Sequence, residues 1–242
     1  MTAGFDEQAT EYHERAFIQR DLSDWVAEWL EPQVSGLEGI EFGAGTGFFT
    51  ERIVRTGISL RATDLSPRMV KVGSVKVPQA HWETADAWKP SSDWRTDRLF
   101  STGLLQWCPS PREALARWRA CLRRDGRVLC GLFAKETLPE LENVLPDASP
   151  LVWRKAKAWE TFYEKAGFRV VRAEASERKY CFKNACAVLR YLHRIGSAQT
   201  GRFAAGALCS AMRNYDTIYT KKGGVPSTWT FFRIECLRIE ND

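Results

Sequence analysis

A short glycine-rich loop behind an acidic residue carries the clearest chemical signal in the sequence. The loop reads EFGAGTG over residues 41–47, between the strand-like run LEGIEF and the helix-like run FFTERIV. Glycine lets a backbone turn sharply and approach a ligand where a Cβ atom would collide, and the start of the next helix offers unpaired N–H groups. Gly47 arrives one residue too early for the G-x-G-x-x-G loop of dinucleotide sites, since Phe48 stands where that pattern needs glycine. The residues predicted to hold a nucleotide cofactor here are Glu41 at the loop entrance, Gly43, Gly45 and Gly47.

Acidic residues that follow the next two strand-like runs could complete this pocket. Asp64 ends the run ISLRAT about 20 residues beyond the loop, the distance at which a carboxylate reaches ribose hydroxyl groups. Such a carboxylate accepts two hydroxyl hydrogen bonds in one charge-assisted contact. Asp86 follows the third run and could accept from an adenine amino group. Each acid also has a plainer interpretation, because Asp64 adjoins the helix-capping pair Ser66-Pro67 and Asp86 could be solvated surface.

Further residues at the strand ends are assigned to the same pocket. Leu65 and Ala87 adjoin the two acids, and we place them on the cofactor wall. The fourth run, LFSTGLLQWC, should bring Leu104, Gln106 and Trp107 near the reactive end of the cofactor. Trp107 could equally be a core side chain, because a large aromatic ring usually packs.

An alternation of strands and helices must position these residues. Apolar residues at helical spacing predict one or two leading amphipathic helices, closed by Pro32. Strands are then expected at 37–42, 58–63, 80–84, 97–102 and 126–134, with helices at 46–56, 66–74 and 110–124. The alternation implies a parallel sheet with right-handed crossovers. Ligands bind beyond the carboxyl ends of such strands, where the predicted residues fall.

The second half of the chain is expected to complete the sheet and to add helices outside it. The linker at 135–150 should be a loop or short helix, followed by a helix at 152–166 that ends at Gly167. A strand near 168–181 precedes a helix over 186–196. The final strand, near 227–239, is expected to form an antiparallel edge pair with the strand near 168–181.

Composition limits the classes of protein to which the chain could belong. With 242 residues, 44% of them hydrophobic, the chain fits one substantial α/β domain. It has no apolar run of about 18 residues, and its polar, acidic start differs from a signal peptide, so a cytoplasmic protein with no membrane partner is expected. The seven cysteines include no C-x-x-C pair and are interpreted as reduced thiols rather than metal ligands. The net charge of +5 is too small to indicate nucleic acid but would suit an acidic protein partner.

The acid-headed G-x-G-x-G loop resembles the S-adenosylmethionine (SAM) loop of class I methyltransferases. Asp64 and Asp86 follow it in the order that this resemblance requires. The resemblance implies a Rossmann-like α/β fold, with a mostly parallel seven-stranded sheet and helices on both faces. It also implies a helical lid built from the N-terminus and from the segment before the last strand. SAM is then the expected cofactor, without a metal.

Longer stretches resemble a narrower family, the malonyl-[acyl-carrier protein] O-methyltransferases of biotin synthesis (the BioC type). The resemblance runs almost end to end, and its most specific parts are LQWC and the helix L-R-x-L-x-x-I-G. The matching stretches are Phe5, Tyr12 and Gln19 of the opening pattern, 64–70, 104–108, 138–141, 189–197 and 219–235. Ala44 and His193 depart from the family pattern, where cysteine and lysine are common. The implied organisation is one domain over 1–242, with lid helices at 1–32, a cofactor-binding core at 33–134, a loop at 135–150 and a helical lid insertion at 182–214.

The chemistry that this family performs needs few catalytic groups. A malonyl carboxyl group is already ionised at neutral pH, as carboxylates with a pKa near ~4 are, so its methylation needs no general base. Catalysis would come from holding one carboxylate oxygen in line with the SAM methyl group. Arg190 matches the arginine of the family helix and is predicted to hold the other oxygen, because its planar fork suits a carboxylate. Tyr12 is predicted to close the pocket over the substrate. Without the resemblance, Arg190 would be read as a solvated helix face and Tyr12 as a packing residue.

The resemblance also implies a partner, an acyl carrier protein that delivers a malonyl group. Acyl carrier proteins are acidic, and complementary charge speeds and orients docking. Basic residues lie on several predicted helices, and the sequence selects no docking face among them. Two alternatives stay open: a methyltransferase of a free small carboxylic acid, and a non-catalytic protein that keeps the fold. Nucleic acid is not an expected partner, because no basic tract interleaved with aromatic residues is present.

Overall fold

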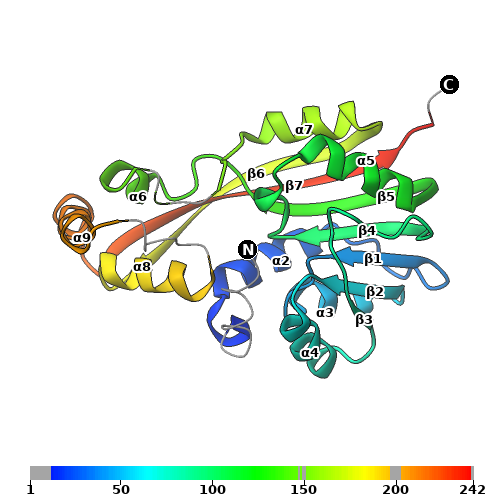
Figure 1. Ribbon diagram of the computed structural model, residues 1–242, viewed down its shortest axis with the longest axis horizontal. Coiled ribbons are helices and arrows are strands. Elements are labelled where there is room, and N and C mark those ends of the chain that lie inside the picture. The colour runs from blue at the N-terminus through cyan, green and yellow to red at the C-terminus, as the bar shows by residue number, and fades with distance from the viewer. Residues whose placement is uncertain (1–11, 147, 149–150, 197–202, 241–242) are drawn as a thin grey trace.

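Seven strands form one sheet in the computed structural model of the chain, which describes residues 12–146, 148, 151–196 and 203–240 (Figure 1). Their order across the sheet is β3-β2-β1-β4-β5-β7-β6. The five strands from β3 to β5 pair in parallel, whereas β7 is antiparallel to both of its neighbours. The strands are β1 (Glu38–Phe42), β2 (Ser59–Asp64), β3 (His81–Thr84), β4 (Thr96–Thr102), β5 (Leu122–Phe133), β6 (Phe168–Phe182) and β7 (Val225–Arg238).

The predicted antiparallel pairing of the last two strands is confirmed, and β7 also pairs with β5. The strand at the edge of the sheet is therefore β6, and β7 lies inside it. Three predicted boundaries were wrong. The helix predicted at 110–124 ends at Cys121, β5 begins at Leu122 rather than at residue 126, and the helix predicted at 152–166 begins at Ala156. Leu122 is fully buried and pairs with Thr96, so the chain is already extended there.

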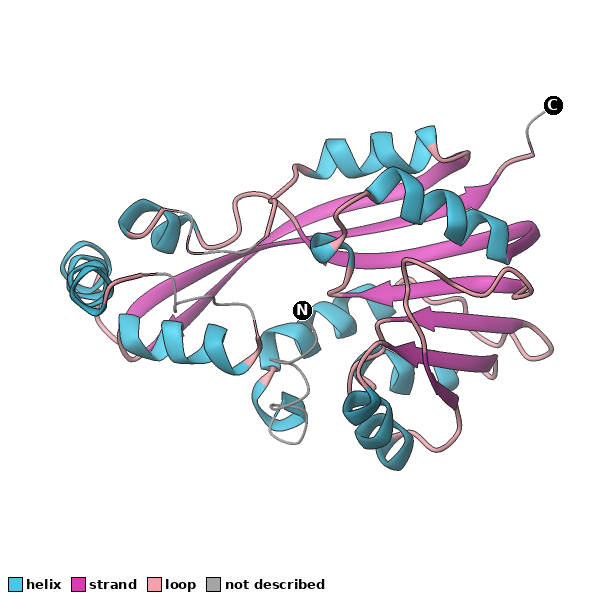
Figure 2. Cartoon of the chain, in the orientation of Figure 1, coloured by secondary structure: helices cyan, strands magenta, loops and turns pink. Residues whose placement is uncertain are grey.

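Helices cover both faces of the sheet, as the class I methyltransferase resemblance implies (Figure 2). One face carries α2 (Phe17–Ala27), α3 (Phe48–Val54) and α4 (Pro67–Lys76), and the other carries α5 (Pro111–Cys121) and α7 (Ala156–Lys165). Consecutive strand residues point to opposite faces. In β4, Leu99 accordingly joins the hydrophobic cluster under α5 and α7, while Phe100 joins the one under α2 and α3. Both side chains are buried, which explains why two apolar residues stand side by side in the middle of this strand.

The strands β6 and β7 are longer than the other five and continue as a two-stranded extension past the ends of those strands (Figure 1). Three helices lie along this extension: α6 (Pro139–Val144), α8 (Ala185–Arg194) and α9 (Ala205–Tyr219). Asn184 caps α8, since its side chain accepts a hydrogen bond from the Ala187 amide at 2.9 Å. Within the described residues, no helix has the length and apolar character needed to cross a bilayer.

Candidate cofactor site

The glycine loop turns from β1 into α3 through backbone conformations that favour glycine. Gly43, Gly45 and Gly47 have φ angles of +68°, +57° and +97°. The Ala44 amide donates to the Thr63 carbonyl oxygen at 2.8 Å, which holds the loop against the end of β2. A Cβ atom built on Gly45 would find no heavy atom within 4 Å. The loop backbone at Gly45 therefore faces open space, in which a ligand can approach it.

Asp64 fixes the shape of this loop. Its two carboxylate oxygens accept hydrogen bonds from the backbone amides of Gly45 and Ser66, each at 2.9 Å. Ser66 in turn caps α4, since its hydroxyl oxygen accepts from the Met69 amide at 3.1 Å. Asp64 therefore stands beside the helix cap and also lines the cavity beneath the loop, so the capping and the cofactor-pocket interpretations do not exclude each other. A carboxylate has lone pairs left to accept further hydroxyl groups.

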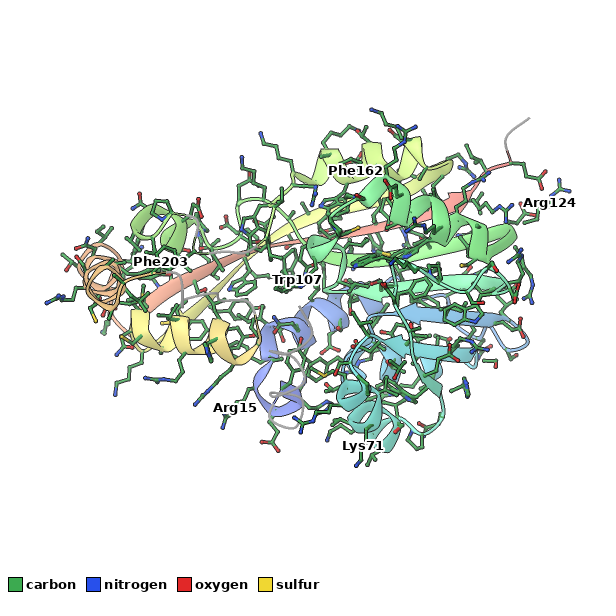
Figure 3. The ribbon with its side chains drawn as sticks, viewed as in Figure 1. Arg15, Lys71, Trp107, Arg124, Phe162 and Phe203 are labelled. Atoms are coloured by element: carbon green, nitrogen blue, oxygen red, sulfur yellow. The ribbon has the colours of Figure 1, made fainter. Side chains whose placement is uncertain are left out.

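A cavity of about 180 Å³ opens at the carboxyl ends of β1 to β4. Seven of the nine residues predicted to bind the cofactor line it: Gly43, Gly45, Asp64, Leu65, Asp86, Ala87 and Leu104. Asp86 is held by a turn in which one carboxylate oxygen accepts from the Trp88 amide at 2.8 Å. Trp107 also lines the cavity, so it is a wall residue rather than a core residue alone. Figure 3 places it in the middle of the molecule, where the strands end.

The other two predicted residues, Glu41 and Gly47, do not line the cavity. Glu41 is only 1% exposed and accepts a hydrogen bond from the Thr50 hydroxyl at 2.6 Å. Burial raises the pKa of Glu41 to about 8, with a further contribution from the nearby Asp64 charge. Gly47 is a glycine because a Cβ atom there would lie 3.0 Å from Val77 Cγ2. We interpret both residues as maintaining the conformation of the loop rather than as contacting a ligand.

A smaller cavity of about 30 Å³ adjoins the first. The two share four lining residues, Tyr12, Gln19, Gly103 and Trp107. The second cavity is otherwise mostly aromatic and aliphatic, with Phe133, Leu138, Leu151, Trp153, Ile195 and Trp229 in its wall. Tyr12 thus stands between the two spaces, and its place over a substrate stays a prediction. Burial and the Asp64 charge raise the pKa of Tyr12, so its hydroxyl group stays protonated and can donate.

Gln106 is a polar residue that lines the second cavity and not the first. The residue is 5% exposed, and its Nε2 donates to the Gly103 carbonyl oxygen at 2.6 Å. That contact fixes the amide orientation, since a carbonyl oxygen accepts and cannot donate. Gln106 Oε1 is buried and accepts no hydrogen bond from the described part of the chain. A buried acceptor of this kind is costly unless a ligand or water supplies a donor.

Arg190 is the predicted site residue that the structure leaves away from both cavities. It lies on the exposed side of α8 and is absent from the wall of either space. Tyr191, next in the chain, points inward instead. Its hydroxyl donates to Gln19 Oε1 at 2.8 Å and accepts from the Ile18 amide at 3.2 Å. The role of Arg190 towards a substrate carboxylate stays a prediction, and Phe5 of the opening pattern lies outside the described residues.

The N-terminal segment covers the glycine loop through contacts that sequence reasoning missed. His13 Nδ1 lies 3.1 Å from the Thr46 hydroxyl oxygen, and its ring packs 4.7 Å from the centre of the Phe48 ring. Burial, Lys76 and Arg20 lower the pKa of His13. Ser23 of α2 lies within hydrogen-bonding distance of Thr102 at the end of β4, 3.2 Å between the hydroxyl oxygens. These polar residues belong to no recognisable sequence motif, and only their tertiary contacts show that they lie at the site.

Comparison with known proteins agrees with this geometry. Residues 40–130 match the family model described as a methyltransferase domain. This segment runs from β1 into β5. The chain is similar to the malonyl-[acyl-carrier protein] O-methyltransferase of Halorhodospira halophila, with 32% identity over 57% of this chain and 50% of that protein. The enzyme of the same name from Paenibacillus is 22% identical and is matched over 93% of both chains. For three relatives the matched region spans 29%, 50% and 60% of their length, which is less than two thirds.

Solved structures show the same fold. A phosphoethanolamine N-methyltransferase of Haemonchus contortus, in complex with S-adenosylhomocysteine, has a TM-score of 0.57 and 16% identity over 91% of this chain and 53% of that one. The [4+2]-cyclase SpnF has a TM-score of 0.60 and 16% identity over 92% of this chain and 82% of that one. At these identities the likeness establishes the fold alone, and a fold hosts different reactions.

The residues of the site fit the SAM cofactor of this fold. The open space beside Gly45, two carboxylates at strand ends and an apolar wall at Ala87 and Leu104 match a ligand with a polar amino-acid end, a ribose and an adenine. Asp64 would hold ribose hydroxyl groups and Asp86 the adenine amino group. The described residues contain no cluster of three His, Cys, Asp or Glu side chains that could hold a metal ion.

Proposed function

We propose that the protein transfers a methyl group from SAM to the free carboxylate of a malonyl thioester on acyl carrier protein. The product would be the malonyl methyl ester that starts pimeloyl and biotin synthesis, made in the cytoplasm. The observation that carries the proposal is the pair of joined cavities, one with the SAM-type loop and the other with an apolar wall. The choice of acceptor is supported by relatives that bear the name malonyl-[acyl-carrier protein] O-methyltransferase.

The side chains around the cavities suit a reaction that needs positioning rather than a base. No histidine, lysine or cysteine occurs among the described residues that line either cavity. An ionised malonyl carboxylate needs no proton removed, so the absence of these three residue types from the described walls is no obstacle. SAM, when bound, supplies the electrophilic methyl group. Tyr12 would donate to the carboxylate oxygen that does not react, and Trp107 would exclude water beside it.

Gln106 favours a thioester over a free small acid. Its buried Oε1 needs a donor, and the pantetheine arm of a carrier-bound acyl group brings amide N–H groups. Malonate and similar free acids are ionised at neutral pH and bring acceptors only. We therefore expect Gln106→Leu to lower kcat/KM about 10-fold with a malonyl thioester, the value of one lost hydrogen bond of ~1.4 kcal/mol. The KM for SAM serves as the control, since Gln106 does not line the first cavity.

Mass spectrometry of malonyl acyl carrier protein after incubation with SAM and the enzyme tests the proposal directly. One added methyl group on the acyl arm is the expected result. The kcat/KM values for malonyl acyl carrier protein, malonyl-coenzyme A, malonate and aconitate should then rank the thioesters first. A large preference for a free acid would refute the carrier assignment in favour of a small-acid methyltransferase. If calorimetry detects no binding of SAM or its demethylated product at high micromolar concentration, the protein is a non-catalytic member of the fold.

A further inference from the structure

The positive charge of the chain is concentrated in one segment. Residues 178–215 contain seven Arg and Lys residues and no Asp or Glu. The whole chain has a formal net charge of +5, so the remaining residues carry a net charge of −2. The seven are Arg178, Lys179, Lys183, Arg190, Arg194, Arg202 and Arg213, and Arg202 lies outside the described residues. The excess charge of the protein thus belongs to the α8–α9 region and not to the methyltransferase core.

Helix α8 presents this charge on one side. Its inward side carries Val188, Tyr191 and Leu192, which are buried. The opposite side carries Lys183, just before the helix, and then Cys186, Arg190, His193 and Arg194, at the spacing that places residues on one helical face. We call these five residues the α8 face. All are exposed except Arg194, which is half-buried. Figure 3 shows nitrogen-tipped side chains that project from α8 away from the sheet.

The cations of the α8 face have no ion-pair partner among the described residues, whereas Arg123, Arg127 and Arg233 elsewhere each pair with carboxylates. Their placement does not favour the helix itself. Arg190 and Arg194 are like charges four residues apart, which destabilises a helix by about 0.2–0.5 kcal/mol. Lys183 lies beside the N-terminus of α8, where a positive charge opposes the helix dipole. Local stability therefore does not explain the face.

The α8 face ends at the substrate side of the site. Ile195, directly after Arg194, lines the second cavity. Tyr191 binds Gln19, which lines both cavities. At 1.5 Å per residue, Arg190 lies roughly 7–8 Å from Ile195 along the helix axis. A macromolecule seated on the α8 face would therefore have the second cavity within reach of a flexible arm.

We propose that the α8 face is the surface on which the acyl carrier protein docks, an inference that rests on the proposed function. A carrier with an acidic surface matches the unpaired cations, and its arm would enter beside Ile195 into the second cavity. A membrane fits less well, because interfacial helices expose large apolar residues, whereas in α8 Val188, Tyr191 and Leu192 are buried and Leu189 is half-buried. A nucleic acid fits less well, because no Phe, Tyr or Trp stands among the five residues of the face.

Charge reversal on the α8 face tests the proposal. The variant Lys183→Glu/Arg194→Glu alters two residues that line neither cavity. The control variant Lys165→Glu/Arg169→Glu makes the same charge change at exposed positions, at the end of α7 and the start of β6, and α7 lies far from α8 in Figure 1. Steady-state kinetics would use malonyl acyl carrier protein and malonyl-pantetheine. We expect the first variant to lower kcat/KM for the carrier substrate by about 10-fold at low salt, since charge complementarity governs encounter. Its kcat/KM for malonyl-pantetheine should stay within about 2-fold, and the second variant should change neither value.

Direct binding separates this proposal from the proposed function. Fluorescence anisotropy of labelled apo acyl carrier protein should give a Kd that rises at least about 10-fold in the α8 variant and hardly at all in the control. If neither thioester is methylated but carrier binding still depends on the α8 face, the proposed reaction fails and the docking surface stands. Equal carrier affinity in both variants and the wild type overturns the docking proposal. It is also overturned if wild-type protein binds phosphatidylglycerol vesicles or duplex DNA through this face and does not bind the carrier.

Discussion

Replacing Glu41 by glutamine should stabilise the protein, and increasingly so as the pH rises. The Glu41 carboxyl is buried beneath the glycine loop, and its pKa is raised from 4.5 to about 8. A carboxyl whose pKa is higher in the folded state favours folding at low pH, and this contribution is lost as the pH rises from 4.5 to about 8. Glutamine removes the titration while keeping an oxygen that can accept from the Thr50 hydroxyl.

The size of the effect follows from the same shift. Each pKa unit corresponds to about 1.4 kcal/mol, so the full shift sets an upper limit of roughly 5 kcal/mol above pH 8. The hydrogen bond from Thr50 is weaker to a neutral amide than to a carboxylate, which reduces the gain in stability by about 1 kcal/mol. The measured cost of a buried charge is also often smaller than this upper limit, so we expect a net gain on the order of 3 kcal/mol at pH 8. For a chain of this size that gain raises Tm by roughly 6–12 °C. Near pH 5 the gain should nearly vanish.

Thermal unfolding followed by circular dichroism between pH 5 and 9, without SAM, measures this difference. Glu38→Gln is the matched control, because Glu38 lies on the same strand but at the surface, paired with Arg123. An exposed pair contributes at most about 1 kcal/mol, so the control should shift Tm by no more than ~4 °C. A Tm difference for Glu41→Gln that does not change with pH would refute the reasoning. The Kd for SAM should stay within a few-fold, because the side chain does not line the cavity.

Three further predictions concern the loop and its cover. Gly45→Ala should weaken SAM binding at least about 10-fold in calorimetry while lowering Tm by only a few degrees, because the added Cβ meets no protein atom and costs about 1–2 kcal/mol of backbone strain. A large fall in Tm would show that the loop is a structural turn alone. Asp64→Ala should raise the SAM Kd by about 100-fold, since it removes a charged acceptor from the Gly45 amide and from the ribose, with a small effect on the KM for the malonyl substrate. Equal losses for both ligands would contradict a cofactor role. His13 has a lowered pKa, so its packing on Thr46 and Phe48 should persist above pH 6.5 and be lost as the pH falls below that value. The SAM Kd of the wild type should therefore rise between pH 7 and 5, and His13→Gln should flatten this rise whereas His81→Gln, at an exposed position, should not.

Part of the fold was predictable because its signals are local. The glycine loop, the capping pair after Asp64 and the alternation of apolar runs each involve residues close in sequence, and all three lie where predicted. The place of β7 between β5 and β6 was not predictable, because a strand's pattern shows which faces it buries and not which neighbours it pairs with. The start of β5 at Leu122 likewise depends on pairing with Thr96, more than twenty positions away.

The sequence by itself determined the cofactor class, because the spacing of the glycines and the acidic residues at the strand ends are local features that indicate a SAM-type loop. Tertiary structure decided which of those residues face the ligand. Glu41 and Gly47 belong to the motif and yet do not line the cavity: the Glu41 side chain turns towards the core, and at Gly47 a Cβ atom would meet Val77. It also decided that Gln106 is an unpaired buried acceptor and that Arg190 faces solvent on the same side as Arg194. Exposure and pairing arise from contacts between distant segments, so no spacing along the chain encodes them.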